Sequence, residues 1–183
     1  MPYVQLGRTQ GLGQAEHSRA LLARDLAAGA ITGELAGVVM MTVLVVAFPL
    51  AMGRSPLVPL QVIGAFVFGD TATEAAHLPS LVAAVVLHLM GPSLLWGLVA
   101  GALVFALNVR RFPSLLPLGL MVGVLAQVVD VNMVLPPAFQ ALHGHNIWAE
   151  NIPTFWSWVA HVVYGLTLTL HAVVFRRLGA YLD

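Results

Sequence analysis

Three ionisable side chains, His88, Asp130 and His161, lie within stretches of sequence that are otherwise apolar enough for the interior of a bilayer. Such side chains are costly at that depth, so they commonly face the inside of a helix bundle or a water-filled cavity. Imidazole and carboxylate groups can bind haem iron or a divalent metal, carry protons, or hydrogen-bond to one another. The three residues are therefore the first candidates for a functional site.

Three interpretations of this group remain open from the sequence. In the first, Asp130 accepts a hydrogen bond from a histidine N–H, and the network only fixes how the helices pack. In the second, His88 and His161 bind a cofactor, either haem b through two imidazoles or, together with Asp130, a divalent metal. In the third, the group forms part of a path for protons or ions.

A second polar pair is expected toward the opposite face of the membrane. Glu34 lies about two helical turns into the first apolar stretch, and His171 lies about one turn before the last one ends. We expect these two side chains to pair. Two polar tiers suit a proton relay or stacked haems, although two separate stabilising bonds give the same pattern.

Four residues outside the apolar stretches could bind a metal at the surface: Glu74, His77, His143 and His145. Glu74 and His77 share one face if their segment is helical, because residues three apart are neighbours on a helix. His143 and His145 form a short His-Gly-His pair in a loop, and imidazole nitrogens are common ligands of divalent ions. A solvated loop is the alternative explanation of the same pair.

The composition restricts the class of protein. Of the 183 residues, 59% are hydrophobic and 9% are charged, whereas a soluble domain carries about a quarter charged residues. The absence of cysteine and lysine excludes disulfides, thiolate metal sites and Schiff-base chemistry. The net charge is zero, so we expect no nucleic-acid partner. The composition is that of an integral membrane protein.

The elements that must position the candidate residues are long apolar helices. A bilayer core needs about 20 helical residues, and four stretches meet that length, at about residues 28–52, 78–107, 115–135 and 155–175. Gly91 and Pro92 predict a kink in the second stretch, and Pro136 and Pro137 are expected to end the third. The predicted fold is an all-α bundle of four transmembrane helices.

Two further segments are expected to be helical without crossing the membrane. The apolar run 57–68 is too short to span, so it should lie at the interface or re-enter between the first two transmembrane helices. Residues 14–28 alternate charged and leucine side chains, which predicts a short amphipathic helix on the membrane surface. We therefore divide the chain into an N-terminal segment 1–27, a membrane domain 28–177 and a C-terminal tail 178–183.

The arginines predict the orientation of the helices. Arg54 alone falls on one predicted side, and the other seven of the eight fall on the opposite side: Arg8, Arg19, Arg24, Arg110, Arg111, Arg176 and Arg177. By the positive-inside rule both termini are cytoplasmic, and we expect a multi-pass protein of the bacterial inner membrane. The three candidate residues then fall in one layer, in the outer half of the bilayer.

Glycines recur every four residues on three of the predicted helices, at Gly29, Gly33 and Gly37, at Gly97 and Gly101, and at Gly119 and Gly123. Such stripes let helices approach closely, which drives association in lipid because apolar burial does not. They predict close helix packing. The packing could be within this chain or against another subunit.

Three stretches resemble uncharacterised bacterial four-helix membrane proteins: residues 28–37, residues 88–92 with Trp96-Gly97, and residues 161–165. In those proteins a glycine-rich first span is followed by spans that open with a histidine and a small-residue stripe. The resemblance implies a four-helix membrane fold and carries no activity or site.

No nucleotide-binding glycine loop, HExxH or GxSxG motif occurs in the sequence, so we expect no enzymatic activity. The expected function is that of an accessory or assembly subunit of a larger membrane complex, such as a respiratory or electron-transfer complex. Its expected partners are membrane lipids and other membrane subunits or copies of itself. The alternatives are a haem-binding, metal-binding or proton-conducting subunit, and a small oligomeric channel or transporter.

Overall fold

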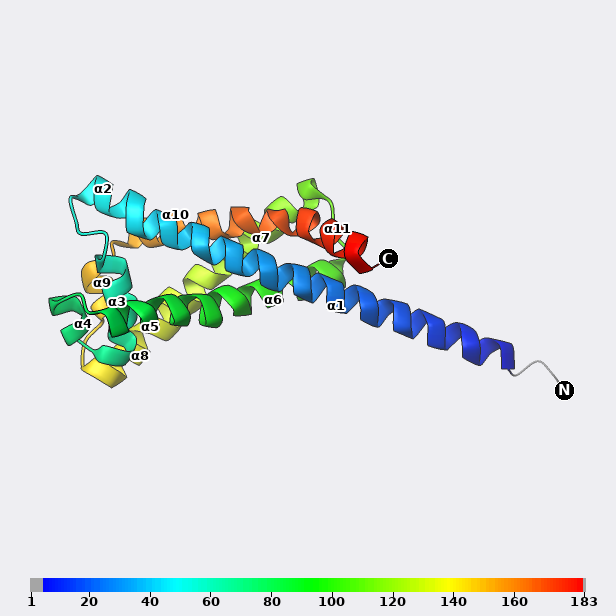
Figure 1. Ribbon diagram of the computed structural model, residues 1–183, viewed down its shortest axis with the longest axis horizontal. Coiled ribbons are helices and arrows are strands. Elements are labelled where there is room, and N and C mark those ends of the chain that lie inside the picture. Colours follow the sequence, from blue (N-terminus) through cyan, green and yellow to red (C-terminus); the bar gives the residue numbers. More distant parts are fainter. Residues whose placement is uncertain (1–4, 183) are drawn as a thin grey trace.

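A computed structural model describes the backbone of residues 5–182 and the side chains of residues 14–180, and within these ranges it contains helices and no strand (Figure 1). Four helices are long and apolar enough to cross a membrane: Gln14–Met52, Leu78–Leu107, Phe112–His143 and Thr154–Ala180. The all-α prediction and the number of candidate spans are confirmed. Four such helices indicate a multi-pass membrane protein.

Each long helix is built from shorter elements that follow one another without a loop. The first contains α1 (Gln5–Thr42), η1 (Val43–Ala47) and α2 (Phe48–Met52). The second contains α5 (Leu78–His88), η2 (Leu89–Ser93) and α6 (Leu94–Leu107). The third contains α7 (Phe112–Ala126), η3 (Gln127–Val134) and α8 (Leu135–His143). The fourth contains α10 (Thr154–Thr167), η4 (Leu168–Leu170) and α11 (His171–Leu182).

The segments η1, η2 and η3 are π-helical turns, so three of the four long helices contain a stretch that is wider than an α-helix. In η2 the cause is visible, because Pro92 has no N–H to donate and Gly91 adopts the non-helical angles φ −92° and ψ −106°. The predicted kink at Gly91 and Pro92 is confirmed. π-Helical turns are rare and frequently occur at functional sites.

The third long helix does not end where the sequence predicted. It continues through Pro136 and Pro137 as α8 and ends at His143, before Gly144 in the left-handed conformation. The prediction failed because both prolines follow the π-helical turn η3 and lie in the first turn of α8. Proline is tolerated in a first turn, since the missing N–H has no partner there in any case.

The glycine stripes join helices of this same chain in two places. Along α1 and α6, a Cβ added at Gly33 would lie 2.6 Å from the Cα of Gly97, so the backbones touch directly. Along α7 and α10, a Cβ added at Gly123 would lie 3.1 Å from the Cα of Gly165. The sequence left open whether the stripes pack within the chain or against another subunit. On these helices they pack within the chain.

The short helices α3 (Val58–Phe68), α4 (Thr71–Glu74) and α9 (Ile147–Asn151) gather with α8 at one end of the molecule (Figure 1). α3 packs against α5, α4 and α9. The predicted short apolar helix is confirmed, with 11 residues. These helices close the end of the molecule where the long helices contain their π-helical turns.

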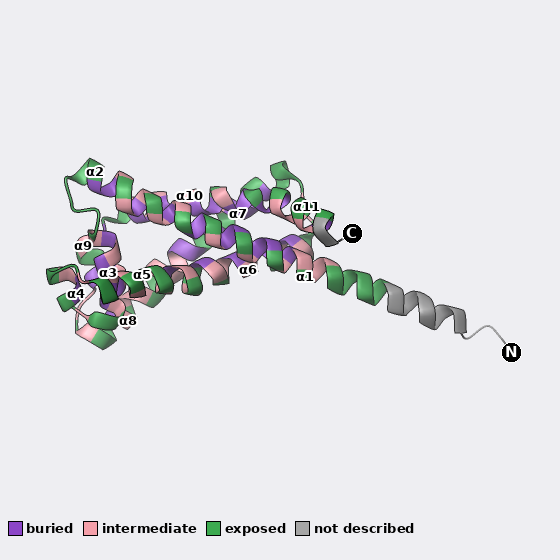
Figure 2. Cartoon of the chain, in the orientation of Figure 1, coloured by how far each residue is buried: buried purple, intermediate pink, exposed green. Residues whose placement is uncertain are grey.

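The amphipathic pattern predicted a separate short helix in the N-terminal segment, and this prediction is wrong. The segment continues straight into the first apolar stretch as one helix, α1, which projects beyond the other helices (Figure 1). Its residues 14–20 are exposed (Figure 2). The C-terminal residues 178–182 are likewise helical, within α11, whereas residues 1–4 and 183 and the side chain of Arg8 lie outside the described part.

Candidate functional site

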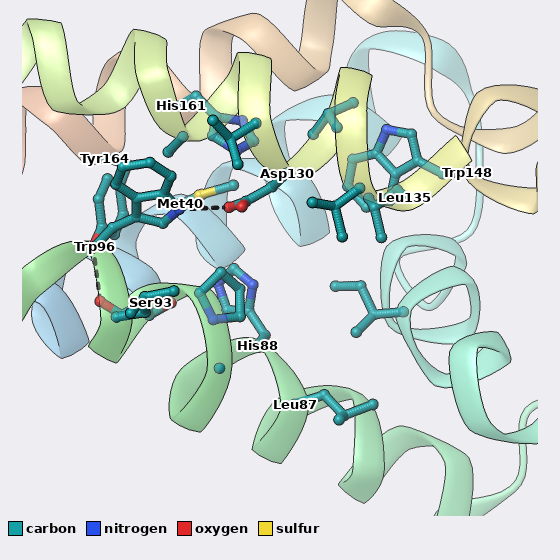
Figure 3. A pocket seen from close by; sticks show the side chains of 18 of the residues that line it. Met40, Leu87, His88, Ser93, Trp96, Asp130, Leu135, Trp148, His161 and Tyr164 are labelled. Atoms are coloured by element: carbon teal, nitrogen blue, oxygen red, sulfur yellow. Dashed lines mark hydrogen bonds between the residues drawn. The ribbon is translucent and has the colours of Figure 1, made fainter. Parts of the chain in front are cut away.

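The structure brings His88, Asp130 and His161 to the wall of a single cavity of about 490 Å³. His88 is the last residue of α5, Asp130 lies in η3, and His161 lies in α10. Figure 3 shows the Asp130 carboxylate between the two imidazoles. The grouping expected from the sequence is therefore found.

Each cavity histidine is held through one ring nitrogen by a backbone carbonyl. The Nε2 of His88 lies 3.1 Å from the carbonyl oxygen of Gly37, and the Nδ1 of His161 lies 2.9 Å from that of Ser157. A carbonyl oxygen only accepts, so each of these nitrogens carries the proton in the neutral imidazole. The opposite nitrogens, His88 Nδ1 and His161 Nε2, have lone pairs and no hydrogen bond to any described residue.

Asp130 does not accept a hydrogen bond from either histidine, which corrects one of the three interpretations. The indole Nε1–H of Trp96 donates to Asp130 Oδ2 at 2.8 Å (Figure 3). The other oxygen, Oδ1, has no partner within the described part of the chain. One carboxylate oxygen is therefore fixed by α6, and the second is free to accept.

Further residues, to which the sequence assigned no contact in the site, complete it. Trp96 positions Asp130, and the hydroxyl of Tyr164 donates to the carbonyl of Ser93 in the kinked turn η2 at 2.8 Å. Aromatic side chains with a polar tip usually find a partner when buried, which was the available signal. Behind the site, Ser157 donates to Gln127 Oε1 at 2.7 Å and ties α10 to η3.

The cavity is deep on one side and exposed on the other. Its inner wall includes the buried side chains of Met40 and Leu44, whereas Pro92, Leu95 and Val134 at its rim are exposed. The rim therefore lies between the kink of the second long helix and the end of η3. Apart from the polar residues already described, the lining is apolar.

Neither proposed metal site gathers enough ligands in the structure. No group of three or more His, Asp or Glu side chains among the described residues is arranged to hold one ion, and this includes His88, Asp130 and His161. At the surface, α4 ends at Glu74 and His77 is extended, so these two residues do not share a helical face.

His143 packs against the ring of Phe139. His145 instead contacts two carboxylates, with Nδ1 2.8 Å from Glu150 and Nε2 2.9 Å from Asp70. The hydrogen bonds to Glu150 and to Asp70 raise the pKa of His145 above its ordinary value. The surface residues thus form a link between α4 and α9, and not the predicted four-residue site.

The fit of haem b depends on the same two imidazoles. Because His88 Nε2 is bonded to Gly37, only its Nδ1 is directed to the cavity, whereas His161 presents Nε2. In the view of Figure 3 the Asp130 carboxylate lies between the two imidazoles. Bis-histidine ligation of haem through Nε2 of both imidazoles is therefore not available here, because Nε2 of His88 is bonded to Gly37.

The second polar tier forms with a different partner. His171 Nε2 lies 3.1 Å from Oδ1 of Asp25, and not beside Glu34. Asp25 is fully buried and also pairs with Arg110 at 2.6 Å. The expected Glu34–His171 pair is therefore wrong, because α1 is longer than predicted and places Asp25 beside α11.

Glu34 lies partly buried in α1, and its Oε1 has no hydrogen-bond partner among the described residues.

No family model, no curated protein and no solved structure matches the chain. The resemblance to bacterial four-helix proteins therefore stays an expectation, and the function has to be argued from the geometry of the cavity.

Proposed function

We propose that this chain is a multi-pass protein of the bacterial inner membrane that binds a lipid-soluble small molecule in the cavity beside His88, Asp130 and His161. The observation that carries the proposal is the convergence of free acceptor atoms from three helices on one apolar cavity. Sites for small molecules are typically apolar, about 300–1,000 Å³ in volume, and contain a few well-placed polar groups. The volume of about 490 Å³ lies in this range.

The position of the rim supports a ligand that arrives from lipid. Pro92, Leu95 and Val134 are apolar and exposed, and they lie on the sides of two apolar helices rather than at a helix end. A molecule dissolved in the bilayer could reach the acceptors sideways without crossing a polar surface.

The binding function can be tested with the cavity tryptophans. Trp96 and Trp148 line the cavity, so a bromine-tagged dodecyl amphiphile that enters it quenches their fluorescence. In nanodiscs we expect saturable quenching, which Ala126→Phe should remove because Ala126 lines the cavity. Leu125→Phe is the matched control, since Leu125 is 41% exposed and does not line it.

Equal saturable quenching in both phenylalanine variants, or none in the natural protein, would contradict binding in this cavity. The thermal unfolding of both variants should be measured in the same nanodiscs. A variant that no longer folds is replaced by Leu44→Trp, which fills the inner wall of the same cavity.

The proposed orientation places both termini in the cytoplasm, on the strength of the arginine distribution. The chain contains no cysteine, so single cysteines can be introduced at the exposed positions Ser18 and Ser55. On intact cells an impermeant maleimide should label Ser55→Cys and leave Ser18→Cys unlabelled until the membrane is opened. The reverse pattern would overturn the orientation, and labelling of both or of neither on intact cells would contradict the placement of the two positions on opposite sides of the membrane.

An accessory role in a larger membrane complex is a second candidate function, supported by the projecting part of α1 (Figure 1). Residues 14–20 are exposed along their whole length and carry both charges, which suits a contact with another protein (Figure 2). A photo-crosslinking residue at His17 should yield an adduct of defined mass in cells, whereas one at the exposed Leu78 should not. The absence of any adduct at His17 would count against this role.

A further inference from the structure

We infer that the ligand of this cavity is a lipophilic primary amine in its protonated form, with a hydrocarbon body and an ammonium head that faces His88, Asp130 and His161. The inference rests on the proposed function and names the class of molecule that the same site would take. It follows from the hydrogen-bonding capacity, the charge and the apolar lining of the cavity.

The unpartnered polar groups of the cavity are mainly acceptors. His88 Nδ1, His161 Nε2 and Asp130 Oδ1 have no partner among the described residues. Two donors nearby are already used, because Trp96 donates to Asp130 and Tyr164 donates to the carbonyl of Ser93. The hydroxyl of Ser93, which can donate or accept, also lines the cavity and has no partner among the described residues. A primary ammonium group has three N–H donors and no acceptor, and so is complementary to these acceptors in kind.

The charge of the cavity points to the same head group. Asp130 lines it, and no arginine is found among the lining residues that the structure describes. Arg110, which does not line the cavity, pairs with Asp25 at 2.6 Å. An ionised carboxylate in apolar surroundings is costly unless it is paired, and a bound cation supplies the missing partner.

The remaining lining suits the hydrocarbon part of such a molecule. Met40, Leu44, Leu135 and Phe139 present apolar side chains toward the interior of the cavity. Trp96 lies beside Asp130, and the face of an indole ring attracts a cation as well as an alkyl chain (Figure 3). A head of donors and a body of hydrocarbon together define an amphiphilic amine.

The test compares three bromine-tagged dodecyl probes in nanodiscs by tryptophan quenching: the primary amine, the trimethylammonium and the alcohol. An alkylamine, like a lysine side chain, is charged at neutral pH. We expect the amine to bind at least about tenfold more tightly than the alcohol, since one charge-assisted hydrogen bond is enough for a factor of this order. The trimethylammonium probe keeps the charge but has no N–H, and should bind more weakly than the amine.

Two carboxylate variants separate the role of Asp130 from a general effect of charge. Asp130→Asn keeps the shape and should remove the preference for the amine over the alcohol. Glu34→Gln is the matched control, because Glu34 lies in an apolar helix but does not line the cavity, and it should keep the preference. His161→Phe should weaken the binding of the amine more than that of the trimethylammonium probe, because the trimethylammonium group has no N–H and so no hydrogen bond to lose.

The outcomes distinguish this inference from the proposed function on which it rests. If the alcohol binds as tightly as the amine and Ala126→Phe removes both, the cavity binds amphiphiles but the amine is not its preferred class. If Asp130→Asn leaves the preference intact, Asp130 is not the recognising group and the inference is overturned. If none of the three probes gives quenching that depends on Ala126, the proposed function itself fails.

Discussion

Backbone carbonyls, and not carboxylates, hold the two cavity histidines. Gly37 and Ser157 each accept one N–H, which fixes the tautomer and turns the second nitrogen of each ring toward the cavity. The carboxylate of Asp130 is in turn fixed by Trp96. Each acceptor is thus held through one atom while another remains available to a ligand. This is the arrangement that a preorganised binding site needs.

The bond between Trp96 and Asp130 should contribute to stability. Trp96→Phe keeps the apolar ring but leaves Asp130 Oδ2 without its donor, which costs about 1–3 kcal/mol for a buried acceptor. We expect the lower part of this range, because Asp130 is only half-buried. Chemical unfolding in detergent measures the loss. Trp158→Phe is the control, since Trp158 is outside the cavity lining and should change the stability little.

His145 should make the contact between α4 and α9 sensitive to pH. Its two ring nitrogens face carboxylates of Glu150 and Asp70, so both bonds need the protonated imidazole. The pKa of His145 is raised by these bonds. The link therefore stabilises the fold fully below the ordinary histidine pKa of about 6.5, and its contribution is lost as pH rises through the raised value.

The measurement is amide hydrogen exchange of α4 and α9 at about pH 5 and about pH 9, on either side of the ordinary histidine pKa. After correction for the chemical exchange rate, protection should fall at the higher pH in the natural protein. His145→Gln should show low protection that does not change with pH. Equal protection of the natural protein at both values would contradict the link.

At the scale of helices, the glycine contacts and the π-helical turns have different effects on the packing. The glycine contacts bring α1 against α6 and α7 against α10 with their backbones touching. Toward the other end of the same helices, η2 and η3 widen or bend the chain at the residues that line the cavity. Close packing at one level and irregular turns at another leave room for a cavity between helices that are otherwise tightly joined.

Gly97→Ala should therefore loosen the packing of α1 against α6. Its added Cβ would lie 2.7 Å from the Cα of Gly33, and backbone atoms cannot move away as a flexible side chain can. Overpacking of this kind costs about 1–3 kcal/mol. Thermal unfolding in detergent should show the loss. Val82→Ile also adds one carbon, but at a position that is 52% exposed, and should leave the unfolding temperature nearly unchanged.

At the scale of the whole molecule, the two ends are held by different interactions. Asp25 connects α1 to α11 through His171 and to the loop between α6 and α7 through Arg110. At the opposite end, the short helices α3 and α9 pack against each other and, with α8, line the cavity from that side. The cluster around Asp25 thus joins α1, α11 and the loop between α6 and α7 at one end of the molecule. The cavity lies toward the other end.

Asp25→Asn should destabilise the whole fold. Removing one partner of a buried ion pair costs about 3–5 kcal/mol because the other charge stays behind. Since 22% of the Arg110 side chain remains exposed, we expect the lower limit of this range. Glu16→Gln, at an exposed position of the same helix, is the matched control. Similar unfolding of the two variants would show that the buried cluster does not stabilise the fold.

Hydropathy, proline and glycine positions were enough to predict much of this protein. The number of long helices, the short apolar helix, the kink at Gly91 and Pro92, and the grouping of His88, Asp130 and His161 follow from them. These features depend on local composition and on depth along a helix. Both can be counted along the chain without knowing which way any helix is turned.

The hydrogen-bond partners were decided only by the tertiary structure. Trp96 and not a histidine donates to Asp130, and Asp25 and not Glu34 meets His171. A partner depends on how each helix is rotated and on its register with its neighbours, and each residue turns an α-helix by about 100°. A π-helical turn such as η3 shifts that rotation again without a clear mark in the sequence. The sequence by itself therefore determined which polar groups share a level, and the packing decided which of them bond and which stay free to bind.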